Sequence, residues 1–133
     1  MPTEEWIRHF ASSLPKSYQN NFGAAAIADH AKISFERRPA SANAGLFTSP
    51  RGSGDPICVV ADDRPGLLAT ISAALVICGL DVIEAEAYTR RIPGEHDEAL
   101  DVFWVRHEAA AKRSAPVAVD EIDRFRQGLT GLL

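Results

Sequence analysis

The sequence has few of the residues on which special scaffolds depend. It contains two cysteines in 133 residues, too few to hold a small secreted fold together through disulfides. Basic residues are also in the minority, with 14 Lys and Arg against 18 Asp and Glu and a formal net charge of -4. This balance argues against a broad nucleic-acid footprint and against an anionic membrane surface as a partner.

Long apolar runs and targeting segments are missing as well. No uninterrupted apolar stretch approaches the roughly 20 residues that a membrane-spanning helix needs. The first ten residues, MPTEEWIRHF, carry two acidic residues where a signal peptide has basic residues followed by an apolar run. We therefore predict a cytoplasmic protein with free thiols, with neither a membrane nor a nucleic acid among its partners.

The remaining composition is that of an ordinary globular protein, with 46% hydrophobic and 24% charged residues in a length that suits one compact domain. Residues 1–40 predict a helical extension, because apolar residues recur at helical spacing on both sides of Pro15, which interrupts the pattern. Residues 41–56 are rich in Pro, Ser, Gly and Ala, which is typical of a linker. Within this linker, residues 46–48 fit a short strand.

Residues 57–133 predict an α+β domain with an antiparallel sheet. Its expected elements follow in the order strand, helix, strand, strand, helix, over residues 57–61, 67–78, 82–89, 100–105 and 122–132. This order is most of a ferredoxin-like fold of the βαββαβ type, from which only the last strand is missing. Residues 46–48 arrive from the N-terminal side, so we expect them to fill the missing place beside the first strand, in the antiparallel direction.

The expected strand at residues 100–105 is apolar on both of its faces. The two helices of a ferredoxin-like domain cover one face of the sheet, so the other face needs a cover of its own. The N-terminal helix with Trp6 and Phe10 is one candidate for that cover, and a second copy of the chain is the other. We predict self-association as a homodimer and keep the intramolecular cover as the alternative.

Two motifs in this region resemble the ACT domain family. They are VVADDRPGLL at residues 59–68 and ALDVFWV at residues 99–105, with GLDV at residues 79–82 between them. The variety they resemble most is the C-terminal ACT domains of the bacterial PII uridylyltransferase/uridylyl-removing enzyme, and LPKSY at residues 14–18 resembles the helical segment that precedes those domains. The resemblance covers residues 57–106 well. It implies a non-catalytic regulatory module that binds a small amino acid, with glutamine as the first choice, and that pairs with a second copy.

The loop at residues 62–68 has the physical properties of an amino-acid receptor. Pro65 fixes φ and Gly66 lacks a Cβ, so the backbone turns sharply and another group can approach closely. The amides that follow open a helix, where unpaired N–H groups favour a carboxylate, and the two acidic residues before the turn suit an ammonium group. The alternative is that Asp63 caps the helix and Gly66 eases packing.

One further position belongs to the expected site. Asp81 stands at the start of the second strand, where many amino-acid-binding ACT domains carry asparagine, and an acid there repels the ligand's carboxylate or recruits its ammonium group. The predicted ligand-binding residues are Asp62, Asp63, Arg64, Pro65, Gly66, Leu67, Leu68 and Asp81.

Catalytic and metal sites find no support in the sequence. The four histidines lie in separate segments without an i, i+4 pair, so we predict no metal and no cofactor. Glu84 and Glu86 share a strand face without a nucleophile nearby, which favours a solvated face over a catalytic pair. Two alternatives to the amino-acid sensor stay open: a ligand-free structural dimerisation module, and a subunit or remnant of a split uridylyltransferase.

Overall fold

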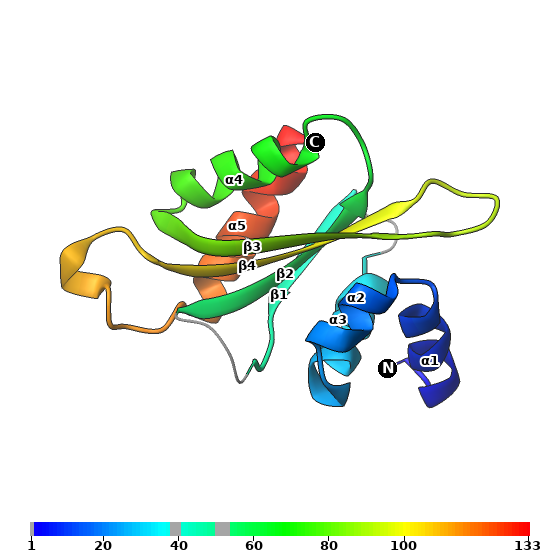
Figure 1. Ribbon diagram of the computed structural model, residues 1–133. Coiled ribbons are helices and arrows are strands. Elements are labelled where there is room, and N and C mark those ends of the chain that lie inside the picture. The colour runs from blue at the N-terminus through cyan, green and yellow to red at the C-terminus, as the bar shows by residue number, and fades with distance from the viewer. Residues whose placement is uncertain (1, 38–40, 50–53) are drawn as a thin grey trace.

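The computed structural model describes residues 2–37, 41–49 and 54–133 and has three layers (Figure 1). The elements of the described residues are α1 (Glu4–Ser12), α2 (Lys16–Asn21), α3 (Ala24–Phe35), β1 (Ala42–Leu46), β2 (Asp55–Asp62), α4 (Leu67–Ile77), β3 (Leu80–Arg90), β4 (Glu98–His107), the 3₁₀ helix η1 (Ala110–Lys112) and α5 (Val119–Leu132). A four-stranded antiparallel sheet lies in the middle, with α1, α2 and α3 on one face and α4 and α5 on the other. The predicted α+β class and antiparallel sheet are confirmed.

The helices of these described ranges are short. None of them is both long enough and apolar enough to cross a membrane. All are 14 residues long or shorter, whereas a membrane span takes about 20.

The strand order in the sheet is β1-β2-β4-β3, and each neighbouring pair is antiparallel. Strand β1 lies beside β2, with Ala42 opposite Ala61 and Leu46 opposite Ile57. It begins four residues earlier than the expected strand at 46–48 and ends at Leu46. Most of its residues are small, which suits a strand that has helices on both sides. Ala42 and Ala44 are packed in the core with α5, and a Cβ on Gly45 would lie 3.0 Å from Cδ1 of Ile33 in α3.

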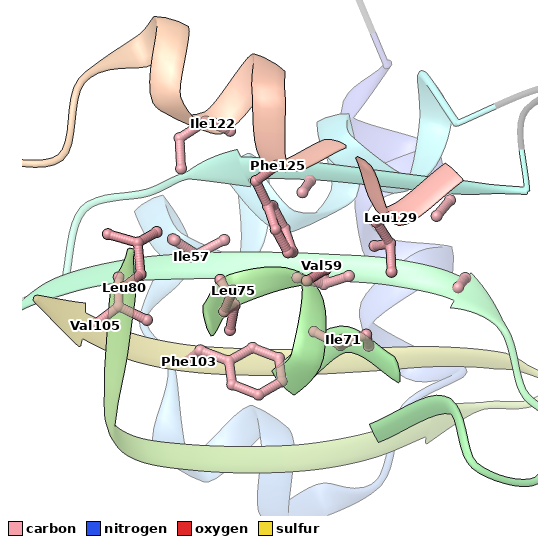
Figure 2. Packing of buried hydrophobic residues seen from close by; sticks show 14 of the residues in the cluster. Ile57, Val59, Ile71, Leu75, Leu80, Phe103, Val105, Ile122, Phe125 and Leu129 are labelled. Carbon is pink, nitrogen blue, oxygen red and sulfur yellow. The ribbon is translucent and has the colours of Figure 1, made fainter. Parts of the chain in front are cut away.

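The first core lies between the sheet and the helices α4 and α5 (Figure 2). Alternate side chains of the two central strands enter it, and each helix adds one apolar stripe at helical spacing. Its labelled members in Figure 2 are Ile57 and Val59 of β2, Phe103 and Val105 of β4, Leu80 of β3, Ile71 and Leu75 of α4, and Ile122, Phe125 and Leu129 of α5. Burial of this surface, at about 25 cal/mol per Å² of apolar area, holds the two helices on the sheet.

The second core lies between the opposite face of the sheet and the N-terminal helices. Leu100, Val102 and Trp104 of β4 point into it, and they meet aromatic side chains from α1 and α2 such as Phe10 and Tyr18. The second apolar face of β4 is therefore covered within the chain. The intramolecular cover is what the structure has, and this face of β4 does not need a second copy of the chain to shield it.

Strand β3 does not alternate regularly between a buried and an exposed face. A bulge between Val82 and Glu84 shifts the register by one residue. Val82, Ile83 and Ala85 are all exposed on β3, which is an edge strand of the sheet. Only the first residue on this face, Leu80, joins the core.

A buried histidine lies in the second core. The Tyr18 hydroxyl and Nδ1 of His30 share a hydrogen bond of 2.6 Å, and the rings of Phe22 and Phe47 flank the imidazole at centroid distances of 5.0 and 4.2 Å. Nε2 of His30 is buried and has no hydrogen-bond partner among the described residues. Burial disfavours the charged imidazolium in this aromatic surrounding and lowers the pKa of His30 to about 3.

Acid should therefore weaken the N-terminal helical layer through His30. Above pH 6.5 the imidazole is neutral whether the chain is folded or unfolded, but below it only the unfolded chain takes up the proton. We expect the unfolding free energy of the wild type, relative to His30→Gln, to fall by about 1.4 kcal/mol per pH unit from pH 6.5 towards pH 3. Urea unfolding at a series of pH values measures it, and His9→Gln, at an exposed site of α1, is the control that should leave the slope unchanged. A constant difference for His30→Gln would contradict the account.

Candidate functional site

The connection from β2 to α4 holds most of the residues that the sequence singled out. Gly66 occupies the N-cap position of α4 with φ of 78° and ψ of 2°, in the left-handed region that favours glycine. A hydrogen bond of 3.2 Å from the Leu67 amide to the Arg64 carbonyl closes the turn into the helix. No side chain in the described residues caps α4, so Asp63 does not act as its cap. The following amides of the first turn have no partner within the helix.

A pocket of about 270 Å³ lies at this N-terminus of α4, between the loop and the sheet. Ala87, Ala99 and Asp101 of β3 and β4 lie in its sheet-side wall. Of the predicted ligand-binding residues, those that line it are Asp63, Arg64, Gly66, Leu67 and Leu68. We call this cavity the α4 pocket.

The other predicted site residues lie outside the α4 pocket. Pro65 belongs to the loop but not to the lining. Asp62 ends β2, and its carboxylate accepts a hydrogen bond of 3.1 Å from Nη2 of Arg37, on the side of the N-terminal helices. Asp81 lies opposite Arg106 near the start of β3, about 20 Å from Ala87 at roughly 3.3 Å per residue. Asp62 and Asp63 point to opposite faces of the sheet because consecutive residues alternate. Asp81 lies far from the α4 pocket because it is near the other end of β3.

Asp101 is the functional candidate that the sequence reasoning missed. It is 4% exposed, and no hydrogen bond or ion pair joins its carboxylate to another described residue, but its oxygens are not fully enclosed and open on the α4 pocket. Burial raises the pKa of Asp101 to about 7, and the nearby Asp63 adds to that rise. A buried carboxylate without a partner is costly and needs an explanation. The sequence does contain a signal for it, because Asp101 is the single acidic residue in the apolar segment ALDVFWV. That segment was interpreted as a strand and its acid was not considered separately.

The α4 pocket offers complementary groups to a zwitterion. The first amides of α4 and the positive end of its dipole favour a carboxylate. Asp101 and Asp63 line the same small cavity and favour a positively charged group. Arg64 stands at the exposed side of the pocket and adds a second attraction for an anion.

Three other reactive side chains, those of His107, Cys58 and Cys78, are engaged or not activated. His107 uses both ring nitrogens, Nε2 with a Glu121 carboxylate oxygen at 2.8 Å and Nδ1 with the Lys112 carbonyl at 3.1 Å, and so ties α5 to β4. Burial raises the pKa of both thiols, Cys58 and Cys78, which keeps them from being activated nucleophiles. The described residues bring together no group of three or more His, Cys, Asp or Glu side chains that could hold a metal ion.

Comparisons of this chain with protein-family models, with curated proteins and with solved structures give no match. The resemblance to ACT domains therefore stays a prediction from the motifs at residues 59–68 and 99–105. The α4 pocket and its buried carboxylate are described by the geometry of this chain alone.

Gly66 provides a test of the loop. A Cβ at this position would meet no atom within 4 Å, so any cost of a side chain comes from the positive φ and not from a clash. We expect Gly66→Val to lower the unfolding free energy by about 1–3 kcal/mol, and Gly66→Asn to cost less because asparagine tolerates this region better. Chemical denaturation of the purified variants measures both values.

Gly128 in α5 supplies the matched control, since it also has open space around its Cβ position but no positive φ. Gly66→Ala should destabilise the protein, whereas Gly128→Ala should stabilise it by up to about 1 kcal/mol through helix propensity. Equal effects at both positions would show that the loop has no conformational requirement for glycine.

Proposed function

We propose that this chain is a non-catalytic regulatory module of the ACT type, and that it binds a free α-amino acid in the α4 pocket. The observation that carries the proposal is Asp101, a buried carboxylate without a partner in the described residues, beside the uncapped N-terminus of α4. The Asp101 carboxylate favours a cation and the N-terminus of α4 favours an anion. An α-amino acid carries an ammonium and a carboxylate group on the same carbon atom. Glutamine is the first candidate because of the motif resemblance.

The topology supports the ferredoxin-like part of the proposal. In a βαββαβ fold the last strand lies antiparallel beside the first, at the edge of the sheet. Here β2, α4, β3, β4 and α5 follow that order, and β1 occupies the edge position beside β2. The N-terminal strand thus stands in for the strand that would follow α5.

The ligand would lie with its carboxylate against the amides of Leu68 and Ala69, because the Leu67 amide is bonded to the Arg64 carbonyl, and with its ammonium group against Asp101 and Asp63. Binding of the ammonium group favours the ionised form of Asp101. Since burial holds the pKa of Asp101 near 7, binding below that pH requires the loss of its proton. The affinity for the amino acid should therefore fall as the pH drops from 7 to 5.

A thermal-melting screen against the twenty amino acids, glutamine first, tests this proposal. At about 100 times the dissociation constant the ligand should stabilise the folded state by about 2.7 kcal/mol, which raises the Tm by several degrees. Two analogues separate the contacts, since N-acetylglutamine lacks the ammonium group and glutamine amide lacks the α-carboxylate. Each should bind at least about tenfold more weakly than the parent, which corresponds to about 1.4 kcal/mol for each lost charge-assisted contact.

Three variants test whether the Tm response comes from binding in the α4 pocket. Asp101→Asn should abolish most of the Tm response and Asp63→Ala should weaken it, whereas Glu84→Gln, on the exposed side of β3, should leave it unchanged. Asp101→Asn should also be the more stable protein without ligand above pH 7, because it removes an unpaired buried charge. If no amino acid at millimolar concentration shifts the Tm of the wild type, the sensor function is rejected.

Exposed apolar side chains favour a second function, self-association. Val76 and Ile77 at the end of α4 are 62% and 76% exposed, and Leu132 of α5 lies across an apolar groove of about 360 Å³ between the two helices. Contiguous exposed apolar surface is characteristic of interaction sites. Pairing of β3 edges is disfavoured, because an antiparallel pair centred on Ala85 would place Glu84 opposite Glu86 of the second copy.

The proposed dimer would therefore form through α4 and α5. Ile77→Asp should shift the protein from dimer to monomer in light scattering, while Ile83→Asp on the exposed edge strand is the matched control that leaves the dimer intact. A monomeric wild type at every accessible concentration would reject the dimer and the dimerisation module with it. The split-uridylyltransferase alternative stays a prediction from the sequence.

A further inference from the structure

A second and larger pocket, of about 390 Å³, lies where the N-terminal helices meet the end of the sheet. The helical side contributes residues of α1 and of the end of α3, and the sheet side contributes residues of β2, β4 and the β3–β4 hairpin. We call this cavity the seam pocket. The residues that matter for its chemistry are Trp6, Phe35, Arg37, Arg90, Glu95 and Glu98.

A buried carboxylate holds two arginines at this pocket. Glu98 accepts hydrogen bonds from Nε of Arg37 at 2.8 Å, from Nε of Arg90 at 3.0 Å and from the Ser34 hydroxyl at 2.6 Å. The side chains of Arg37, Arg90 and Glu98 are 14%, 9% and 2% exposed. Two guanidinium groups thus face one buried carboxylate, whereas the carboxylate of Asp62, which also pairs with Arg37, is 53% exposed and is screened by water.

Only some of the N–H donors of the two guanidinium groups are used in hydrogen bonds within the described residues. Nη2 of Arg37 donates to Asp62, whose carboxylate is largely exposed, and Nη1 of Arg90 makes a long contact of 3.4 Å with the Ser13 hydroxyl. Nη1 of Arg37 and Nη2 of Arg90 have no hydrogen-bond partner in the parts of the chain that the structure describes. Donors of this kind are strong when they meet an anionic oxygen in a shielded site.

Aromatic rings form the wall next to these donors. Trp6 and Phe35 make an edge contact at a centroid distance of 5.4 Å, and both line the pocket. The guanidinium carbon of Arg90 lies 5.8 Å from the Trp6 ring centroid. An apolar surface and anion-binding donors are thus adjacent in one cavity of the size that small-molecule sites have.

We propose that the seam pocket binds a small monocarboxylate that carries an aromatic ring. The carboxylate would lie on the Nη groups of Arg37 and Arg90, and the ring would lie against Trp6 and Phe35. The exposed carboxylates of Asp62 and Glu95 stand at the same pocket, so a dianion such as phosphate is repelled more strongly than a ligand with a single negative charge. The ligand would contact the helical layer and the sheet at once.

Calorimetry and thermal melting with phenylacetate as the probe test this inference. Phenylacetate should bind and raise the Tm, whereas the neutral isostere phenylacetamide, acetate without the ring, and inorganic phosphate should each bind at least about tenfold more weakly, by about 1.4 kcal/mol for each lost interaction. Absence of heat and of any Tm shift with phenylacetate at about 10 mM, a concentration that detects contacts worth only a few kcal/mol, would overturn the proposal.

Two variants locate the binding. Arg37→Lys keeps the charge but removes the planar fork, and it should weaken phenylacetate by about tenfold or more. Trp6→Leu removes none of the hydrogen bonds of Glu98, so it tests the aromatic wall even if Arg37→Lys folds poorly. Arg91→Gln, next to Arg90 but 83% exposed, and Asp101→Asn in the α4 pocket are controls that should bind normally. Equal affinity of all four variants, or loss of binding in Asp101→Asn alone, would refute the seam site.

Discussion

The side chains of β4 alternate between two cores, and the remaining architecture depends on that alternation. Phe103 and Val105 point towards α4 and α5, whereas Val102 and Trp104 point towards the N-terminal helices. A strand that is apolar on both sides must be covered on both sides, and here the chain provides both covers itself. The helical extension is therefore an integral layer of the fold. Its burial of aromatic surface also explains why His30 is sealed from water and held neutral.

The same strand carries two buried acids with opposite environments. Glu98 faces the N-terminal helices and is satisfied by two arginines and a serine. Asp101 faces α4 and has no such partner in the described residues. The first acid joins the helical layer to the sheet and sets up the charge of the seam pocket. The second acid has no cationic partner among the described residues, and the proposed amino-acid site rests on that. Both sites thus derive their chemistry from acids placed in an apolar strand.

Two buried groups also make opposite contributions to stability as the pH changes. His30 is held neutral, so acid weakens the fold below pH 6.5. The pKa of Asp101 is raised to about 7, so this group lowers the unfolding free energy progressively as the pH rises from about 4 to 7. Across the shared range, the two effects oppose one another. The wild type can therefore be less sensitive to pH than either single variant, and the two layers of the protein respond to acid in opposite directions.

The sequence by itself determined the local elements and the loop. The apolar run of β2, the helical spacing of α4 and the positive φ of Gly66 follow from residue type and period, because these depend on neighbours in the chain. It also pointed to the N-terminal segment as the source of the fourth strand, although that strand, whose side chains between the two helical layers are mostly small, begins four residues earlier.

Only the tertiary structure decided which polar groups meet. It separated Asp62 from Asp63, because consecutive residues leave a strand on opposite faces, and it kept Asp81 at the far end of β3. It brought Asp101, which lies 34 positions after Leu67 in the chain, beside the first turn of α4. It also covered β4 with α1–α3 instead of a second chain. A pattern along the sequence records the faces of each element, but contacts between distant segments depend on register, bulges and packing, which local periodicity does not encode.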